Sequence, residues 1–228
     1  MKSITEIIKP ITLLRWSRLD TAQTGQGCFM NVIAYLNGET QITDHPECVC
    51  LAVRAIAIVL NDLMPDDQRH RLILFIERVM DTANASKEVL VMRANAAAKF
   101  AVICSALAAT AATAAAKSTA ATVAKAIESA EYAAEADQYA KFTAESYNAA
   151  DAAQYAASAA EYAARGAHSA AKSAKSAEYA ARLVKIIEAA IACLDEMCPK
   201  SAMITNHETF ARAENFVKLT KECFEARL

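Results

Sequence analysis

The chain has 228 residues, enough for one large domain or two small ones with a buried core. Its formal net charge of −2 gives no basic footprint for nucleic acid phosphates and is far from the acidity of a DNA mimic. Hydrophobic residues make up 55% of the chain, but alanine inflates this figure and buries little area per residue.

The cysteines and the first residues indicate a cytoplasmic protein. Seven cysteines are an odd number spread over a long chain, unlike the dense, even framework of a secreted disulfide scaffold. The opening segment MKSITEIIKPITLL carries charges and a proline, with no small-residue cleavage site after an apolar core. We therefore expect no signal peptide and a reducing environment.

Residues 3–18 are predicted to form an opening helix. Ser3 and Glu6 have the spacing of a capping box, in which each side chain bonds the other residue's backbone N–H. Pro10 should bend or split this helix. The apolar residues fall on one stripe: Ile4, Ile7, Ile8, Ile11 and Leu14.

Three further elements are predicted before residue 85. Residues 28–37 form a short apolar run ending at Gly38, which favours helix termination, with a strand as the alternative. Residues 44–47 and 64–67 each place proline and acidic residues where a helix N-terminus favours them. The second of these helices should run to about Met80. Its apolar face consists of Leu72, Phe75, Ile76 and Val79.

A group of charged residues follows Pro65. It comprises Asp66, Asp67, Arg69, His70 and Arg71. We interpret the group as the solvated first turn of the predicted helix, against the alternative of an acid/base or anion site.

The stretch from about Ala94 to Ala192 is alanine-rich, has no proline and contains one glycine, Gly166. Alanine has the highest helix propensity, so long helices are expected, with Ser86 capping the helix that enters this stretch. Acidic residues before Gly166 and basic residues after it favour a hairpin over a single rod. Alanine helices pack closely, and whether they pair within one chain or between chains of a homo-oligomer stays open.

The longest uncharged run, residues 100–116, is at the short edge of a membrane span, and its alanines and threonines contribute little insertion energy. We expect a buried central helix here, with membrane insertion as the alternative. A last helix is predicted from the capping box Thr205–Glu208 to the terminus. The predicted fold is all-α: an N-terminal helical module (1–85), an alanine-rich long-helix hairpin or bundle (86–200) and a C-terminal helix (201–228) that packs back on it.

Five tyrosines in the alanine-rich stretch are candidate binding residues, because tyrosine offers apolar area and a hydroxyl at modest entropic cost. At helical spacing the first three share a face, and the register changes near Asp151. The alternative is that they fill gaps inside a helical bundle. The candidates are Tyr132, Tyr139, Tyr147, Tyr155 and Tyr162.

A second candidate site is a metal or small-ligand site at His45, Glu47, Cys48 and Cys50, whose side chains are zinc ligand types. No matching Cys-x2-Cys or His-x3-His pair lies elsewhere, so the alternative is a pair of buried cysteines behind a helix cap. If Cys48 lies in the first turn of a helix, its thiol pKa should be lowered and the thiol reactive. No other cofactor is indicated.

Residues 27–82 resemble the leading part of a family of uncharacterised bacterial and phage proteins. The shared features are Cys28-Phe29-Met30, the step Asp44-x-Pro46-x-Cys48-Val49, Asn61-Asp62, Asp66-Asp67 before a helix, and the alanine-rich tail. The alanine-rich part is also similar in composition to immunity proteins of bacterial toxin systems. The resemblance implies no catalytic residues.

Together these observations favour a non-enzymatic interaction protein, an inhibitor or immunity-type binder of bacterial or phage origin. Its protein partner is expected to dock along the tyrosine-bearing helices. The alternative function is a metal- or small-ligand-binding protein that uses the His45–Cys50 cluster.

Overall fold

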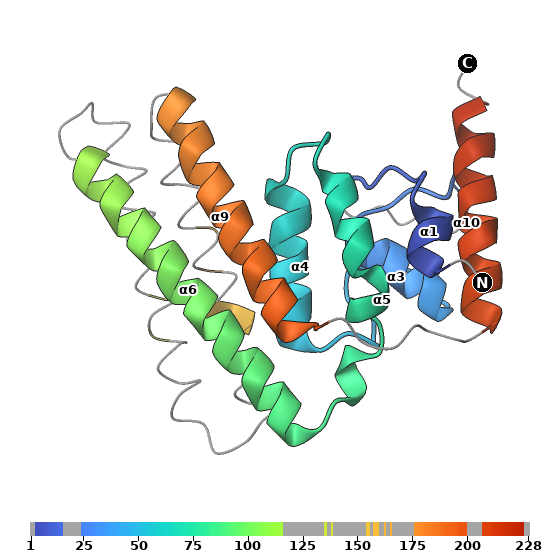
Figure 1. Ribbon diagram of the computed structural model, residues 1–228, viewed down its shortest axis with the longest axis horizontal. Helices are drawn as coiled ribbons and strands as arrows, with labels where there is room; N and C mark the ends of the chain where they lie inside the picture. The colour runs from blue at the N-terminus through green and yellow to red at the C-terminus, as the bar shows by residue number, and fades with distance from the viewer. Residues whose placement is uncertain are drawn as a thin grey trace. The chain divides into compact units, whose positions relative to one another are not determined.

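The computed structural model describes residues 3–15, 24–115, 154–155, 157–159, 176–199 and 207–225, with the single residues 135, 138, 162 and 165. Within these residues the fold is all-α, as predicted, and no strand forms (Figure 1). Among the described residues, Leu13 and Gly27 form an isolated β-bridge.

The chain divides into two compact units, and each is assembled from separated segments. Unit 1 comprises Met1–Cys50, Met64–Asn84 and Cys198–Leu228. Unit 2 comprises Leu51–Leu63 and Ala85–Met197.

Unit 1 contains short helices and the C-terminal helix. Helix α1 (Ile4–Ile8) packs against α10 (His207–Glu225), against α5 (Ile76–Val79) and against the 3-10 helix η1 (Arg69–Phe75), and α10 also packs on α3 (Phe29–Asn37). A further 3-10 turn, η2, spans Thr82–Asn84. The large side chains buried in this unit include Ile4, Ile8, Leu13, Phe29, Met30, Ile33, Leu36 and Phe216.

The predicted capping box is confirmed, but the predicted length of the first helix is wrong. Ser3 Oγ accepts a hydrogen bond from Glu6 N at 3.1 Å, and Ser3 N donates to Glu6 Oε2 at 2.9 Å. Helix α1 then ends at Ile8, two residues before Pro10. Pro10 has no backbone N–H to continue the helical hydrogen bonds, and its ring clashes with the preceding turn, so it ends this helix instead of bending it.

Residues 29–37 are helical, as α3, with Cys28 as the extended N-cap residue, and Gly38 ends the helix as predicted. Gly38 adopts φ 80°, a left-handed conformation that glycine reaches without steric cost. Its N–H donates to Tyr35 O, and Glu39 N donates to Ala34 O, so the last carbonyls of the helix are satisfied.

The prediction that a helix starts at residues 44–47 is wrong, because α4 (Leu51–Leu63) begins only at Leu51. The backbone before it bonds to the segment around η2 instead of to a helix of its own. Cys50 N donates to Thr82 Oγ1 at 3.1 Å, and Ala83 N donates to Cys48 O at 3.0 Å. These long-range bonds hold residues 48–50 in a non-helical path.

The predicted helix over about residues 64–80 forms as the 3-10 helix η1 followed by the short α5. Its apolar face is as predicted, since Leu72, Phe75, Ile76 and Val79 are all buried.

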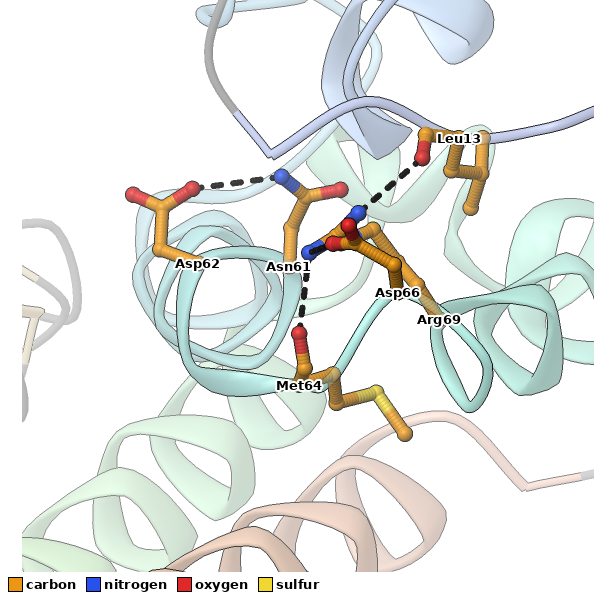
Figure 2. A network of polar contacts seen from close by, with 6 residues as sticks. All are labelled: Leu13, Asn61, Asp62, Met64, Asp66 and Arg69. Carbon is orange, nitrogen blue, oxygen red and sulfur yellow. Dashed lines mark hydrogen bonds and ion pairs between the residues drawn. The ribbon is translucent and has the colours of Figure 1, made fainter.

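The charged group after Pro65 is solvated only in part. Asp66, Asp67, His70 and Arg71 are exposed, but the Arg69 side chain is buried (Figure 2). Its Nη1 donates to Leu13 O at 3.2 Å and its Nη2 donates to Met64 O at 2.9 Å and to Asp66 Oδ1 at 2.7 Å. Arg69 therefore joins the extended segment after α1 to the turn before η1.

Unit 2 is built from α4, α6 (Lys87–Ala115) and α9 (Ser176–Met197), which all contact one another. Helices α6 and α9 run antiparallel (Figure 1). Arg93 Nε donates to Met197 O at 3.0 Å, so the N-terminal half of α6 lies beside the C-terminal end of α9. Ser86 caps α6, as predicted, with Val89 N donating to its Oγ at 3.5 Å.

Alanines lie at the contacts inside unit 2. Ala96, Ala97, Ala101 and Ala190 are almost fully buried, and the Cys193 thiol donates to Ala96 O at 3.3 Å. A side chain as short as cysteine can reach the backbone of the neighbouring helix only because the two axes lie close together.

Several predictions fall outside the described residues. They concern the reversal at Gly166, the register change near Asp151 and the Thr205 half of the last capping box. None of the helices that the structure describes is long and apolar enough to cross a membrane.

Candidate functional site

The four predicted metal ligands lie in the loop between α3 and α4, where the structure does not gather them. His45 is exposed and pairs with Asp44, at 3.3 Å between Nε2 and Oδ1, and Glu47 is exposed, whereas Cys48 and Cys50 are buried. No group of three or more His, Cys, Asp or Glu side chains among the described residues could hold a metal ion.

The expectation of a reactive Cys48 is wrong. Burial raises the pKa of the Cys48 thiol from 9.0 to about 11, and this outweighs the backbone hydrogen bond at Asp81, which lowers it. Because α4 begins three residues later, Cys48 does not lie in a helical first turn that would stabilise a thiolate. Cys104 in unit 2 is also buried, and burial raises its thiol pKa as well.

The structure describes two of the five tyrosines that were predicted to bind a partner. Tyr155 and Tyr162 are half-buried, and Tyr132, Tyr139 and Tyr147 lie outside the described residues.

The structure shows a different candidate site on α6. A groove of about 670 Å³ opens to solvent in unit 2 and is lined mainly by α6, with Glu196 of α9 at its edge. We call the α6 part of this lining the α6 face. It consists of Glu88, Val91, Met92, Asn95, Ala98, Lys99 and Val102.

Large apolar side chains on this helix face solvent. Val102 is 57% exposed, the neighbouring Ile103 is 47% exposed and Val91 is 37% exposed. The run 100–116 was expected to form a buried helix, but only Phe100, Ala101 and Cys104 of its first five residues are buried. The helix therefore has one covered side and one open side.

Charged groups flank the apolar part of the α6 face. Lys99 Nζ lies 2.8 Å from Glu196 Oε1, and this hydrogen bond with its charge raises the pKa of Lys99. The pKa of Glu88 is lowered, first by its own backbone N–H and then by the Ser86 hydroxyl. Both side chains are thus charged at neutral pH, one near each end of the face.

The α6 face follows a spacing that is visible in the sequence. Val91, Asn95, Ala98 and Val102 are separated by four, three and four residues, the spacing of a helical seam. Composition hid this signal, because apolar residues, four of them alanines, occupy most of the intervening positions and make every side of the helix look similarly apolar. Comparison of the chain with protein-family models, with curated proteins and with solved structures gives no match.

Proposed function

We propose that the protein acts through protein–protein binding and that the α6 face is its docking surface. The observation that carries the proposal is the concentration of exposed apolar side chains. Of the five large apolar side chains exposed among the described residues, three lie on α6: Val91, Val102 and Ile103. Single exposed apolar residues are normal on a protein surface, whereas a group of them beside a groove is typical of an interaction site.

The geometry suits a helical partner. Apolar residues at helical spacing, with charged groups at the rim, accept an amphipathic helix laid along them. The apolar contacts would supply the affinity, and Glu88, Lys99 and Glu196 would select the orientation.

An inhibitor or immunity-type role is the narrower form of this proposal. It is supported by the sequence resemblance alone, and in it the partner also contacts the tyrosine-bearing positions Tyr132 and Tyr139.

The test uses a matched pair of valine substitutions. Val102→Asp places a charge in the α6 face, and Val184→Asp places one on α9 at a site with similar exposure, 48%. Tagged proteins are used to capture partners from a lysate of the source organism, with folding checked by circular dichroism. Val102→Asp should abolish capture of a protein that wild type and Val184→Asp both retain. Equal capture by all three proteins would contradict the proposal.

A further inference from the structure

The α6 face is symmetric along the helix about Asn95. Its other members lie three residues away (Met92, Ala98), four residues away (Val91, Lys99) and seven residues away (Glu88, Val102) on either side. Residues at these separations share one side of a helix. An antiparallel copy of α6, related by a twofold axis at Asn95, would therefore place each of these residues level with another member of the same face.

We infer that the occupant of the α6 face is α6 of a second copy of this chain, paired antiparallel about Asn95. The inference rests on the proposed function, because it names the partner of the same docking surface. A twofold interface must be complementary to itself, and the residues of the α6 face meet this condition in size, in polarity and in charge.

Size and polarity match across the axis. Val91 lies on the same edge of the seam as Ala98 of the second copy, so a larger side chain meets a short one and the two can interdigitate. Asn95 lies opposite Asn95 of the second copy, and an amide has both the donor and the acceptor that another amide needs. A polar side chain in a helical seam is costly without a polar partner, and a second copy supplies that partner automatically.

Charge also matches. Glu88 lies level with Val102 of the second copy and, on its own edge of the seam, within one helical turn of that copy's Lys99. Lys99 already bonds Glu196 at 2.8 Å, but an ammonium group has three donors and can also bond the incoming Glu88. The aliphatic stem of Lys99 would cover Met92 of the second copy, which lies on the same edge of the seam. Two such Glu88–Lys99 pairs form, one on each side of the axis.

The pairing is expected to be reversible. The groove has eight lining residues, far fewer than the roughly 20–30 residues per side of a stable interface. Association should therefore depend on concentration and on salt.

A charge exchange tests the inference on the full-length protein by sedimentation velocity. In a dimer of either single variant, Glu88→Lys or Lys99→Glu, positions 88 and 99 of the two copies carry like charges at both contacts. Each variant alone should therefore self-associate about tenfold more weakly than wild type. An equimolar mixture of the two should recover association to near the wild-type level, because every introduced charge then faces its opposite. Wild type that stays monomeric at all concentrations, or a mixture no stronger than either variant, would overturn the inference.

A cross-linking pair tests the orientation. The thiols introduced by Asn95→Cys meet at the proposed axis, so mild oxidation should give a covalent dimer. In the antiparallel pair the thiols introduced by Val102→Cys lie about 21 Å apart along the helix and should not cross-link. Wild type is the control, since the six cysteines whose side chains the structure describes are buried. Cross-linking of both variants, or of neither, would overturn the antiparallel pairing.

The two proposals fail in different ways. If the protein is monomeric but Val102→Asp still loses another captured protein, the inference falls and the docking surface stands. If wild type neither self-associates nor captures a protein through this face, both fall.

Discussion

The two units differ in how many alanines they bury among the described residues. Unit 1 encloses large residues such as Phe29 and Phe216 between short helices. It is also joined by side chains that bond distant backbone carbonyls, as Arg69 does with Leu13 O and Arg212 with Leu36 O. Unit 2 also buries large residues, among them Phe100, Leu60 and Leu194, and Arg93 bonds Met197 O, but α6 and α9 in addition bury alanines such as Ala97 and Ala190. Unit 1 should therefore be sensitive to the loss of single side chains, and unit 2 to anything that separates its helix axes.

The largest expected effect is in unit 1, at Arg69. The Arg69 side chain is only 3% exposed and bonds two buried backbone carbonyls. The substitution Arg69→Met removes both hydrogen bonds and leaves these buried acceptors without donors. The free energy of unfolding should fall by about 3 kcal/mol in urea denaturation.

The control for Arg69 is its ion-pair partner. The Asp66 side chain is 84% exposed, so Asp66→Ala should cost less than about 1 kcal/mol. If the two substitutions cost the same, the carbonyl contacts do not stabilise unit 1 as described.

The next effect is in unit 2, where adding volume should be harmful. Ala97→Leu forces a larger side chain into a fully buried position on α6 and should destabilise the protein by about 1–3 kcal/mol. Ala106→Leu, at an exposed position of the same helix, should be nearly neutral. Thermal unfolding of both variants measures the difference. A neutral Ala97→Leu would mean that the helix axes of unit 2 are not held close together.

The last expected effect, which appears only at alkaline pH, concerns Cys48. Above pH 9.0 the unfolded thiol loses its proton, while the folded thiol keeps it up to about pH 11, so the unfolded chain binds fewer protons. The Cys48 contribution to stability is therefore present below pH 9 and is lost as pH rises through 11. The stability of wild type relative to Cys48→Ala should fall over that window in urea denaturation. A constant difference would show that the thiol is not desolvated.

Local signals in the sequence predicted local structure well. The capping box at Ser3 and Glu6 depends on residues three apart, and the helix end at Gly38 depends on one backbone conformation. The α4 boundary could not be predicted in this way. Residues 44–47 carry a helix-start signal, but the bonds that decide the boundary come from Thr82 and Ala83, more than thirty residues away.

The candidate site was harder to predict than the fold. The sequence favoured ligand types and aromatic residues, such as His45 and Tyr132, because these carry recognisable chemistry. The α6 face has little such chemistry, and its apolar run looked like a buried helix. Which side of an alanine-rich helix is covered depends on where α4 and α9 pack, and that information is tertiary.

The most direct test of the docking surface is sedimentation velocity of wild type, Val102→Asp and Val184→Asp over a concentration series. We expect wild type and Val184→Asp to show an average mass that rises with concentration, and Val102→Asp to stay monomeric. Identical behaviour of all three proteins would contradict the assignment of the α6 face as the surface through which this protein binds a second copy.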